Sequence, residues 1–278
     1  MSLGRVEYRA IKLDQMNAFF QEEVESRADP DGYLPGWYET RYLNKKDKTW
    51  RKRKLCHKDT IHLYDLMYWC IKPKCEEKKC SYVQLVAEKP QKPAWFVSHW
   101  WGEPVRDFVR CLNEHARVRA LPPDTAYWVC AYANNQFELG ADLSSDPRKS
   151  SFFRAMQLAE GVLLVLDPNA TPFTRIWCAF EEATVADGEL GLLLDIATVY
   201  VEPGAPEGKR AAVITEDAQE KVRKLLNLVS EEVPNNPVLA AEMLRLASGA
   251  MSFAFRPRTT GYSASARSLA AASTSALS

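Results

Sequence analysis

The chain has no excess charge of either sign. Lys plus Arg and Asp plus Glu each number 36 among its 278 residues. A molecule without an overall field does not attract nucleic acid or an anionic membrane as a whole, so any charge effect must be local. Long apolar segments are also missing, because residues 1–9 lack a signal-peptide core and no apolar run is long enough to span a bilayer. We therefore expect a cytoplasmic protein that binds neither a membrane nor a specific nucleic acid.

Cysteine is present, but without a pattern typical of disulfides or zinc. The seven cysteines are Cys56, Cys70, Cys75, Cys80, Cys111, Cys130 and Cys178. An odd and scattered set argues against a disulfide framework and indicates reduced thiols. The first four, with His57 and His62 nearby, invite interpretation as a zinc site, but they include no CxxC pair. We predict no metal site and no resident cofactor.

The centre of the chain alternates between strand and helix signals. Apolar runs predict strands at 94–98, 127–132, 162–166 and 193–201, and helical spacing of apolar residues predicts helices at 105–117, 151–158, around Trp177 and at 216–229. Such alternation gives a parallel sheet with helices on both faces and right-handed crossovers. The fold class is therefore α/β, with a parallel sheet of four to five strands in an α/β domain at 93–235.

The flanks of this domain differ from it in composition. Residues 8–27 have the periodicity of an amphipathic helix, and a second helix is predicted at 61–70. Residues 1–92 thus form an N-terminal helical and aromatic-basic extension, whose aromatic content predicts that it packs on the domain. A C-terminal helix is predicted at 236–255, followed by a disordered Ser/Ala-rich tail at 256–278.

The extension also contains a basic run around Trp50, from Lys45 to Lys54. Such a run is able to contact phosphate or to act as a nuclear import signal. Most such runs are solvated loops, and the balanced charge of the whole chain favours that interpretation.

One carboxylate follows a buried-strand signal at helical spacing from a tryptophan. The apolar run 161–167 ends in a polar loop, as a central parallel strand does. Thr171 is a suitable cap for the next helix and Pro172 suits its first turn. On that helix Trp177 and Glu181 stand at i and i+4, so they share one face. Glu182 is the fallback carboxylate.

Further polar and aromatic residues follow the predicted strands, at the edge where open parallel sheets bind ligands. The candidate ligand-contacting residues are Ser98, His99, Trp100, Trp101, Gly102, Asn134, Asn135, Gln136, Asp167 and Trp177. The histidine is suited to phosphate binding or proton transfer, the indoles to stacking on a base, and the amides to contacts with ribose. Each also has a structural interpretation: a backbone hydrogen bond, core packing or a turn.

The region 93–231 resembles the Toll/interleukin-1 receptor (TIR) domain family, on motifs in the family's order. Phe96-Val97-Ser98 ends the first strand as in that family, and Gly102-Glu103 follows at the family's spacing. Leu139-Gly140 lies where a TIR loop carries a similar pair, and Trp177-Cys178-Ala179-Phe180-Glu181 matches the Trp-Cys-x-x-Glu phrase. By contrast, His99-Trp100-Trp101 replaces the aromatic-Arg pair of plant-type members. These phrases together are similar to a divergent TIR-like group from single-celled eukaryotes.

The resemblance implies a flavodoxin-like fold and three alternative functions. In the family branch that cleaves NAD the matching glutamate is catalytic, which implies an NAD glycohydrolase with NAD as substrate, Glu181 as catalytic residue and residues 98–102 lining the pocket. The first alternative is a non-enzymatic signalling module that associates with itself or with other TIR-like proteins. The second is a nucleotide sensor that binds without cleaving. If Glu181 is instead a surface glutamate on an amphipathic helix, Trp177 fills the core beside it.

Overall fold

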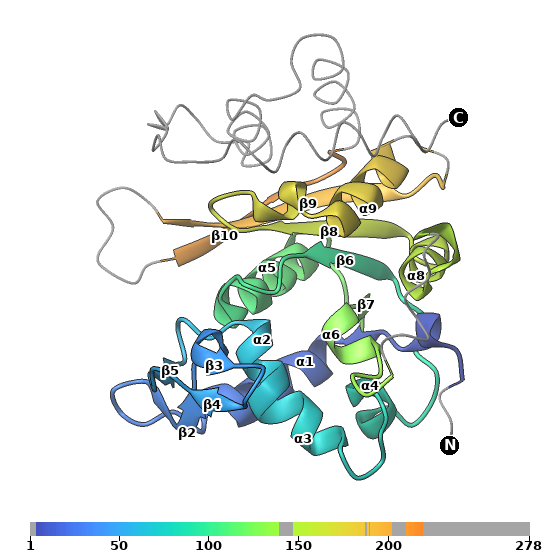
Figure 1. Cartoon of the computed structure of the whole chain (residues 1–278). Helices are drawn as coiled ribbons and strands as arrows, with labels where there is room; N and C mark the ends of the chain where they lie inside the picture. The colour runs from blue at the N-terminus through green and yellow to red at the C-terminus, as the bar shows by residue number, and fades with distance from the viewer. Residues whose placement is uncertain (1–3, 139–146, 187, 189, 202–209, 219–278) are drawn as a thin grey trace.

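The computed structural model describes residues 4–138, 147–186, 188, 190–201 and 210–218. Its centre is a six-stranded sheet in the order β1-β7-β6-β8-β9-β10 (Figure 1). The strands are β1 (Ile11–Lys12), β7 (Ala126–Trp128), β6 (Trp95–His99), β8 (Gly161–Leu166), β9 (Leu193–Val201) and β10 (Arg210–Thr215). The four inner strands are parallel, and β1 and β10 pair antiparallel at the edges. The predicted α/β class is confirmed, and the order of the parallel strands is consistent with a flavodoxin-like fold.

The two central strands are buried on both faces. Every residue of β6 and β8 is buried, as expected for parallel strands covered by helices on each side. Alternate side chains enter different cores: Trp95 and Val97 pack on one face, and Phe96 packs with Leu164 on the other.

Helices cover both faces of this sheet (Figure 1). Helix α5 (Val105–Val118) buries Phe108 and Leu112 in the same core as Val97. Helices α8 (Ser151–Leu158) and α9 (Ile176–Ala186) supply Met156 and Val185 to the opposite core. Since α5 follows β6 while α9 follows β8, the chain leaves these neighbouring strands toward opposite faces.

The N-terminal extension packs on the α5 face and shares its core (Figure 1). Its helical elements are α1 (Leu13–Phe20), the π-helix η2 (Gln21–Glu25), α2 (Leu63–Leu66), the π-helix η4 (Met67–Ile71), α3 (Lys72–Cys75), α4 (Tyr82–Val86) and two 3-10 turns, η1 (Val6–Tyr8) and η3 (Thr40–Tyr42). The sequence did not predict its two small antiparallel sheets, which pair β2 (Tyr33–Tyr38) with β5 (Leu55–His57) and β3 (Leu43–Asn44) with β4 (Thr49–Trp50). Both are two-stranded ribbons, which depend on packing for stability.

Several predicted bounds were wrong for identifiable reasons. The helix expected at 8–27 begins only at Leu13, because residues 11–12 pair with β7. The strand expected at 127–132 ends at Trp128, and the short helix α6 (Cys130–Ala133) follows, in which Tyr132 packs edge-on against Phe19. The helical run expected at 61–70 extends through Cys75.

The entry to α9 also differs from the prediction. Thr171 and Pro172 do not start that helix but form a separate 3-10 turn, η6 (Thr171–Thr174). The Asp167 carboxylate accepts hydrogen bonds from both the amide and the hydroxyl of Thr171, which fixes this turn before α9 begins at Ile176. The edge strand β10 was not predicted. The helices expected at 216–229 and 236–255 and the tail at 256–278 lie largely or wholly outside the described residues.

Nothing in the described helices has the length and apolar character needed to cross a membrane.

Candidate functional site

The candidate site lies where β6 and β8 end side by side. His99 pairs with Val165 in the parallel register, so the chain leaves both strands at the same edge. Because β6 continues to α5 and β8 continues toward α9 on the other face, this is the topological switch point of the sheet. Open α/β sheets bind their ligands at such points, outside the carboxyl ends of the strands.

Buried polar side chains gather at this edge. Five of them, here called the carboxyl-edge cluster, are Ser98, His99, Glu103, Glu181 and Glu182. The three carboxyl groups are each 4% exposed, and His99 is 6% exposed. Strand β6 supplies the first two residues, the loop before α5 supplies Glu103, and α9 supplies the remaining pair. Elements far apart in sequence thus bring buried polar groups to one edge of the sheet, with His99 and Glu103 on the α5 face and Ser98 beside Glu181 on the α9 face.

The polar atoms of this cluster are poorly satisfied. Among the described residues, no hydrogen-bond partner is found for His99 Nδ1, Glu103 Oε1 or Glu182 Oε1. The Nδ1 atom of His99 and the Oε1 atom of Glu103 are 3.9 Å apart, beyond hydrogen-bond distance. Buried polar groups are almost always hydrogen-bonded, since an unpaired group costs about 1–3 kcal/mol. Such a concentration therefore requires an explanation other than packing.

Burial drives the cluster toward neutral forms. It raises the pKa of Glu181 to about 8, although the neighbouring Ser98 hydroxyl partly offsets the rise. Burial, and then the Glu181 charge, raise the pKa of Glu182 well above its ordinary value. Burial also raises the pKa of Glu103, with a contribution from Asp167, and lowers the pKa of His99 to about 4. At neutral pH these residues favour protonated carboxyl groups and an uncharged imidazole.

Two thiols border the cluster without being activated by it. The Sγ atom of Cys178 lies 3.7 Å from the His99 carbonyl oxygen, and Cys130 Sγ lies 4.0 Å from His99 Nε2. Burial raises the pKa of Cys130 to about 12 and raises that of Cys178 as well. A nucleophilic cysteine needs a lowered pKa, so both behave as small buried side chains.

The tryptophans after β6 are held by packing. The Trp101 indole N–H donates to Cys130 Sγ at 3.0 Å, and its ring lies 5.4 Å from that of Tyr64. The Trp100 ring lies directly over Gly102, where a Cβ atom would meet Trp100 Cζ2 at 2.1 Å. Gly102 is therefore required for this loop conformation, and neither indole is free to stack on a ligand as it stands.

The remaining predicted residues are engaged elsewhere or not described. The Asn135 side chain donates to the Lys79 carbonyl at 2.8 Å, and Gln136 donates to backbone carbonyls at 3.4 Å. Asp167 stabilises its own loop through residues 169 and 171. Asn134 is buried and its Oδ1 atom has no partner among the described residues. The Trp177 side chain and the pair Leu139-Gly140 lie outside the described residues.

The N-terminal extension closes the edge. The Leu63 amide donates to the Trp101 carbonyl at 3.0 Å, and the Val105 amide donates to the Ile61 carbonyl at 2.8 Å. These bonds run on both sides of Gly102 and Glu103, so residues 61–64 fasten the whole β6–α5 loop. The three carboxyl groups of the cluster are each 4% exposed, so they are shut off from solvent in this conformation.

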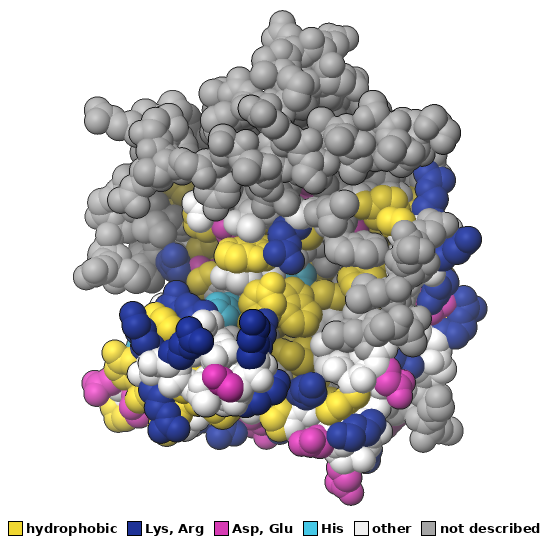
Figure 2. Space-filling view, in the orientation of Figure 1, with side chains coloured by type: hydrophobic (Ala, Val, Ile, Leu, Met, Phe, Trp, Pro, Cys, Tyr) yellow, Lys and Arg dark blue, Asp and Glu magenta, His cyan; other side chains and the backbone are white. Residues whose placement is uncertain are grey.

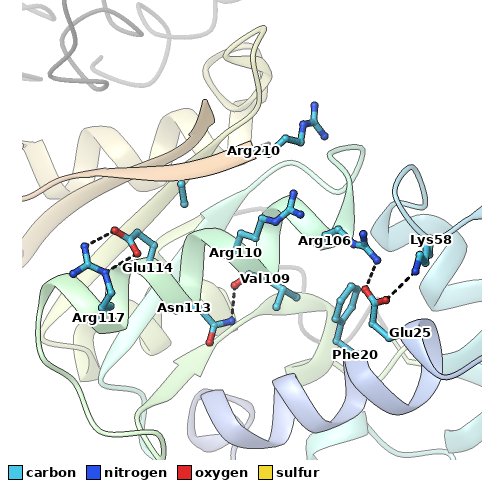
Figure 3. Close-up of a pocket in the computed structure, with 11 residues that line it drawn as sticks. Phe20, Glu25, Lys58, Arg106, Val109, Arg110, Asn113, Glu114, Arg117 and Arg210 are labelled. Atoms are coloured by element: carbon cyan, nitrogen blue, oxygen red, sulfur yellow. Dashed lines mark hydrogen bonds and ion pairs between the residues drawn. The ribbon is translucent and has the colours of Figure 1, made fainter. Parts of the chain in front are cut away.

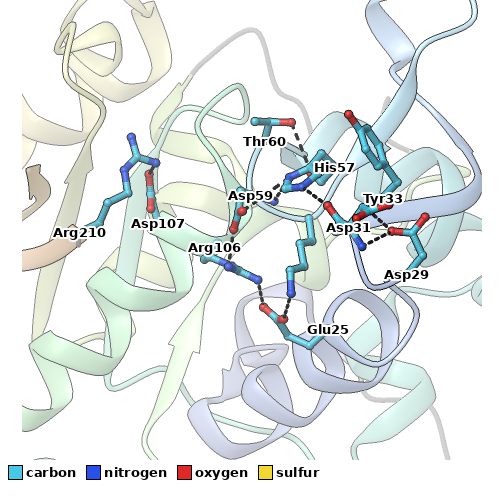
Figure 4. Close-up of polar contacts among 11 residues, drawn as sticks. Glu25, Asp29, Asp31, Tyr33, His57, Asp59, Thr60, Arg106, Asp107 and Arg210 are labelled. Atoms are coloured by element: carbon cyan, nitrogen blue, oxygen red, sulfur yellow. Dashed lines mark hydrogen bonds and ion pairs between the residues drawn. The ribbon is translucent and has the colours of Figure 1, made fainter. Parts of the chain in front are cut away.

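A groove of 610 Å³ lies at a different place, on the α5 face (Figure 3). It is lined by Phe20, Glu25, Lys58, Arg106, Val109, Arg110, Asn113, Glu114, Arg117, Arg210 and Ala212. Its cations are paired: Arg106 with Glu25 and Asp59, and Arg210 with Asp107 at 2.6 Å (Figure 4). Lys58, Arg110 and Arg117 are also ion-paired, so most of the positive charge of the groove is compensated.

The cysteines of the extension do not assemble into a metal site in the described part of the chain. No group of three or more His, Cys, Asp or Glu side chains there is placed to hold a metal ion. Cys56, Cys70 and Cys75 are buried, and burial raises the pKa of each thiol. They contribute to the core of the extension instead.

Sequence reasoning found most of this edge but missed the part played by Glu103. Its spacing of four residues from His99, across a loop rather than a helix, gave no periodic signal. No protein-family model, curated protein or solved structure matches the chain. The resemblance of residues 93–231 to TIR domains therefore stays a prediction from the motifs.

Proposed function

We propose that the protein is a nucleotide-processing hydrolase that releases nicotinamide from NAD at the carboxyl-edge cluster, with Glu181 as the catalytic carboxylate. The observation that carries this proposal is the presence of three buried carboxyl groups and His99 at the switch-point edge of a parallel sheet, for which no Lys or Arg partner is found within the described residues. Strongly perturbed acids in such a position are typical of functional sites. The choice of NAD rests on the resemblance of residues 177–181 to the TIR motif.

In this reaction Glu181 stabilises the positive charge that develops on the ribose. The C1′–N bond breaks, nicotinamide leaves with the bonding electron pair, and positive charge develops on the ribose. An ionised carboxylate beside C1′ stabilises that charge, and water then adds at C1′ and loses a proton. In the closed form burial keeps the pKa of Glu181 near 8, so its carboxyl group is largely protonated at neutral pH. Opening would admit both substrate and water and favour the ionised form.

The site must therefore open for turnover. The contacts that fasten it are the backbone hydrogen bonds of residues 61 and 63 and the Tyr64–Trp101 ring contact. Because these contacts come from the extension, residues 1–92 are the natural element to control access. Self-association is one way to trigger this opening, so the assay covers a wide range of protein concentration.

The test measures nicotinamide release from NAD by the full chain over a wide range of protein concentration. Each variant is assayed in the natural background and in Tyr64→Ala, which loosens the contact with Trp101. Release that disappears in Glu181→Gln, but persists in the exposed control Glu88→Gln, supports the hydrolase. Absence of release in both backgrounds, from protein whose folding is verified by circular dichroism, rejects it.

The burial of Glu181 also favours a second candidate, a non-enzymatic TIR-like interaction module. A carboxyl group that never meets solvent is compatible with a fold that signals through its surface. Self-association seen by light scattering, without NAD turnover in either background, supports the module. NAD binding seen by calorimetry without turnover supports the third candidate, a nucleotide-binding sensor.

A further inference from the structure

The extension carries a surface that the proposed hydrolase does not use. We define the basic–aromatic surface as the side chains of Lys45, Lys46, Lys48, Arg51, Lys52, Arg53 and Lys54 together with Tyr38, Trp50, Tyr68 and Trp69. All seven cations are exposed. In Figure 2, Lys and Arg side chains gather at the lower left, over the region of β3, β4 and β5. A chain with no net charge thus concentrates positive charge in one place.

Most of these cations are not neutralised. Asp47, the one acid between positions 45 and 54, accepts hydrogen bonds from Asn44 and Thr49, within its own turn. Lys54 pairs with Glu39 at 3.0 Å. Within the described residues no ion pair is found for the other lysines or for Arg51. This sets the surface apart from the groove on α5, whose cations are compensated.

Aromatic rings lie directly beside the cations. Trp50 and Trp69 stack with ring centroids 5.8 Å apart and planes 12° from parallel. Tyr68 stands edge-on to Trp50 and is 42% exposed, and the Arg53 guanidinium lies over the Tyr38 ring at 5.3 Å. The Trp69 indole donates to the Tyr38 carbonyl at 2.7 Å, which fixes the group on η4. The rings form a rigid, partly exposed aromatic platform.

We propose that the basic–aromatic surface binds single-stranded nucleic acid without sequence preference. Unpaired lysines and arginines attract successive phosphates, and exposed aromatic rings stack on unpaired bases. A duplex keeps its base faces hidden and would use only the cations. An anionic membrane surface would attract the same cations, but it offers no unpaired base to stack on the ring of Tyr68 beside Trp50 and Trp69.

The first test measures the fluorescence anisotropy of a labelled 15-nucleotide oligo(dT) with the full chain, between 50 and 200 mM salt. We expect binding that weakens with salt. The variant K45E/K46E/K48E should lose at least about tenfold in affinity, and its salt slope should fall by roughly 2, since three phosphate contacts are removed. The control K78E/K89E/K92E makes the same charge change at exposed lysines elsewhere and should stay within about threefold.

The second test separates stacking from simple charge attraction. Tyr68→Ala should weaken oligo(dT) binding by about fivefold or more and leave binding to a 15-base-pair duplex unchanged. Equal losses in the two lysine variants, or no effect of Tyr68→Ala, would overturn the proposal. So would binding to phosphatidylserine vesicles by a chain that does not bind oligo(dT). The helical content of each variant, measured by circular dichroism, verifies folding.

Discussion

Opposite halves of the same sheet each hold a buried histidine with buried carboxylates, and the two groups are built differently. The amino-edge network consists of His115, Arg119, Tyr127 and Asp195. In it the imidazole contacts the Tyr127 hydroxyl at 2.9 Å and the Asp195 carboxylate at 3.0 Å, and Arg119 binds both oxygens of that carboxylate. In the carboxyl-edge cluster the His99 Nδ1 and Glu103 Oε1 atoms find no partner among the described residues. The two groups of side chains are similarly buried, but only the amino-edge network has its polar atoms hydrogen-bonded.

The difference is the one expected between a structural network and a site with the function that we propose. Burial opposes the charge of Asp195, but hydrogen bonds from Arg119 and His115 outweigh it and hold the pKa of Asp195 below its ordinary value. At the carboxyl edge the effect of burial exceeds that of the Ser98 hydroxyl, and the pKa of Glu181 rises to about 8. A network with every polar group paired stabilises the fold it belongs to. Unpaired buried acids do not, and this is why we propose a role beyond folding for them.

The largest expected effect is at the amino edge. Asp195→Ala should lower the free energy of unfolding by about 3–5 kcal/mol, because it leaves Arg119 and His115 without their buried partner. Urea unfolding at pH 7, followed by tryptophan fluorescence, measures the loss. Asp217→Ala is the matched control: that carboxylate also binds Arg119, but it is 61% exposed, so we expect a loss below about 1 kcal/mol. Equal losses in both variants would break the comparison.

A smaller, pH-dependent effect is expected at the carboxyl edge. Between the ordinary pKa of 4.5 and about 8, the folded protein keeps a proton on Glu181 that the unfolded chain has released. Stability therefore falls as pH rises through this window, by up to about 1.4 kcal/mol per pH unit, and is fully present below it. Glu181→Gln removes this pH dependence. The free energy of unfolding of the variant, relative to that of the natural protein, should therefore increase from pH 5 to pH 8.

Urea unfolding of both proteins at several pH values measures that gain. Glu88→Gln, an exposed control, should follow the natural protein throughout. Parallel stability curves for Glu181→Gln and the natural protein would mean that the carboxyl group is solvated. In that case the contrast between the two edges would disappear.

The sequence predicted the fold where the signal is local. Apolar runs located β6, β8 and β9, and helical spacing located α5 and α8 almost to the residue. The two-residue strand β1 gave no such signal, because it forms only by pairing with β7. Strand β10 likewise depends on β9 for its pairing, and the ribbons of the extension depend on tertiary packing.

The site was predictable as a set of positions but not as a geometry. Polar residues after strands indicated the correct edge, and Glu181 and His99 both lie there. The sequence did not indicate that Asp167 would cap its own loop or that Asn135 would bind the Lys79 carbonyl. Nor did it show that residues 61–64 would fasten the loop at 101–105. Apart from the local turn at Asp167, these are long-range contacts, which the periodicity of the sequence does not predict.

The smallest expected effect compares two glycines, one at each edge. A Cβ atom at Gly161 would meet the buried Trp95 ring at 2.5 Å and Leu193 Cβ at 3.0 Å, whereas one at Gly102 would meet only the Trp100 ring, at 2.1 to 2.5 Å among its nearest atoms. Trp95 is 2% exposed and packs on His115, so it cannot give way, and Gly161→Ala should cost about 1–3 kcal/mol. Trp100 is half-buried in a loop, so fewer neighbours hold its ring than hold the buried Trp95 ring. We therefore expect Gly102→Ala to lower the melting temperature less than Gly161→Ala.

An equal or larger decrease in melting temperature for Gly102→Ala would mean that the carboxyl-edge loop is as rigid as the amino edge. The opening that turnover requires would then have to come from α9.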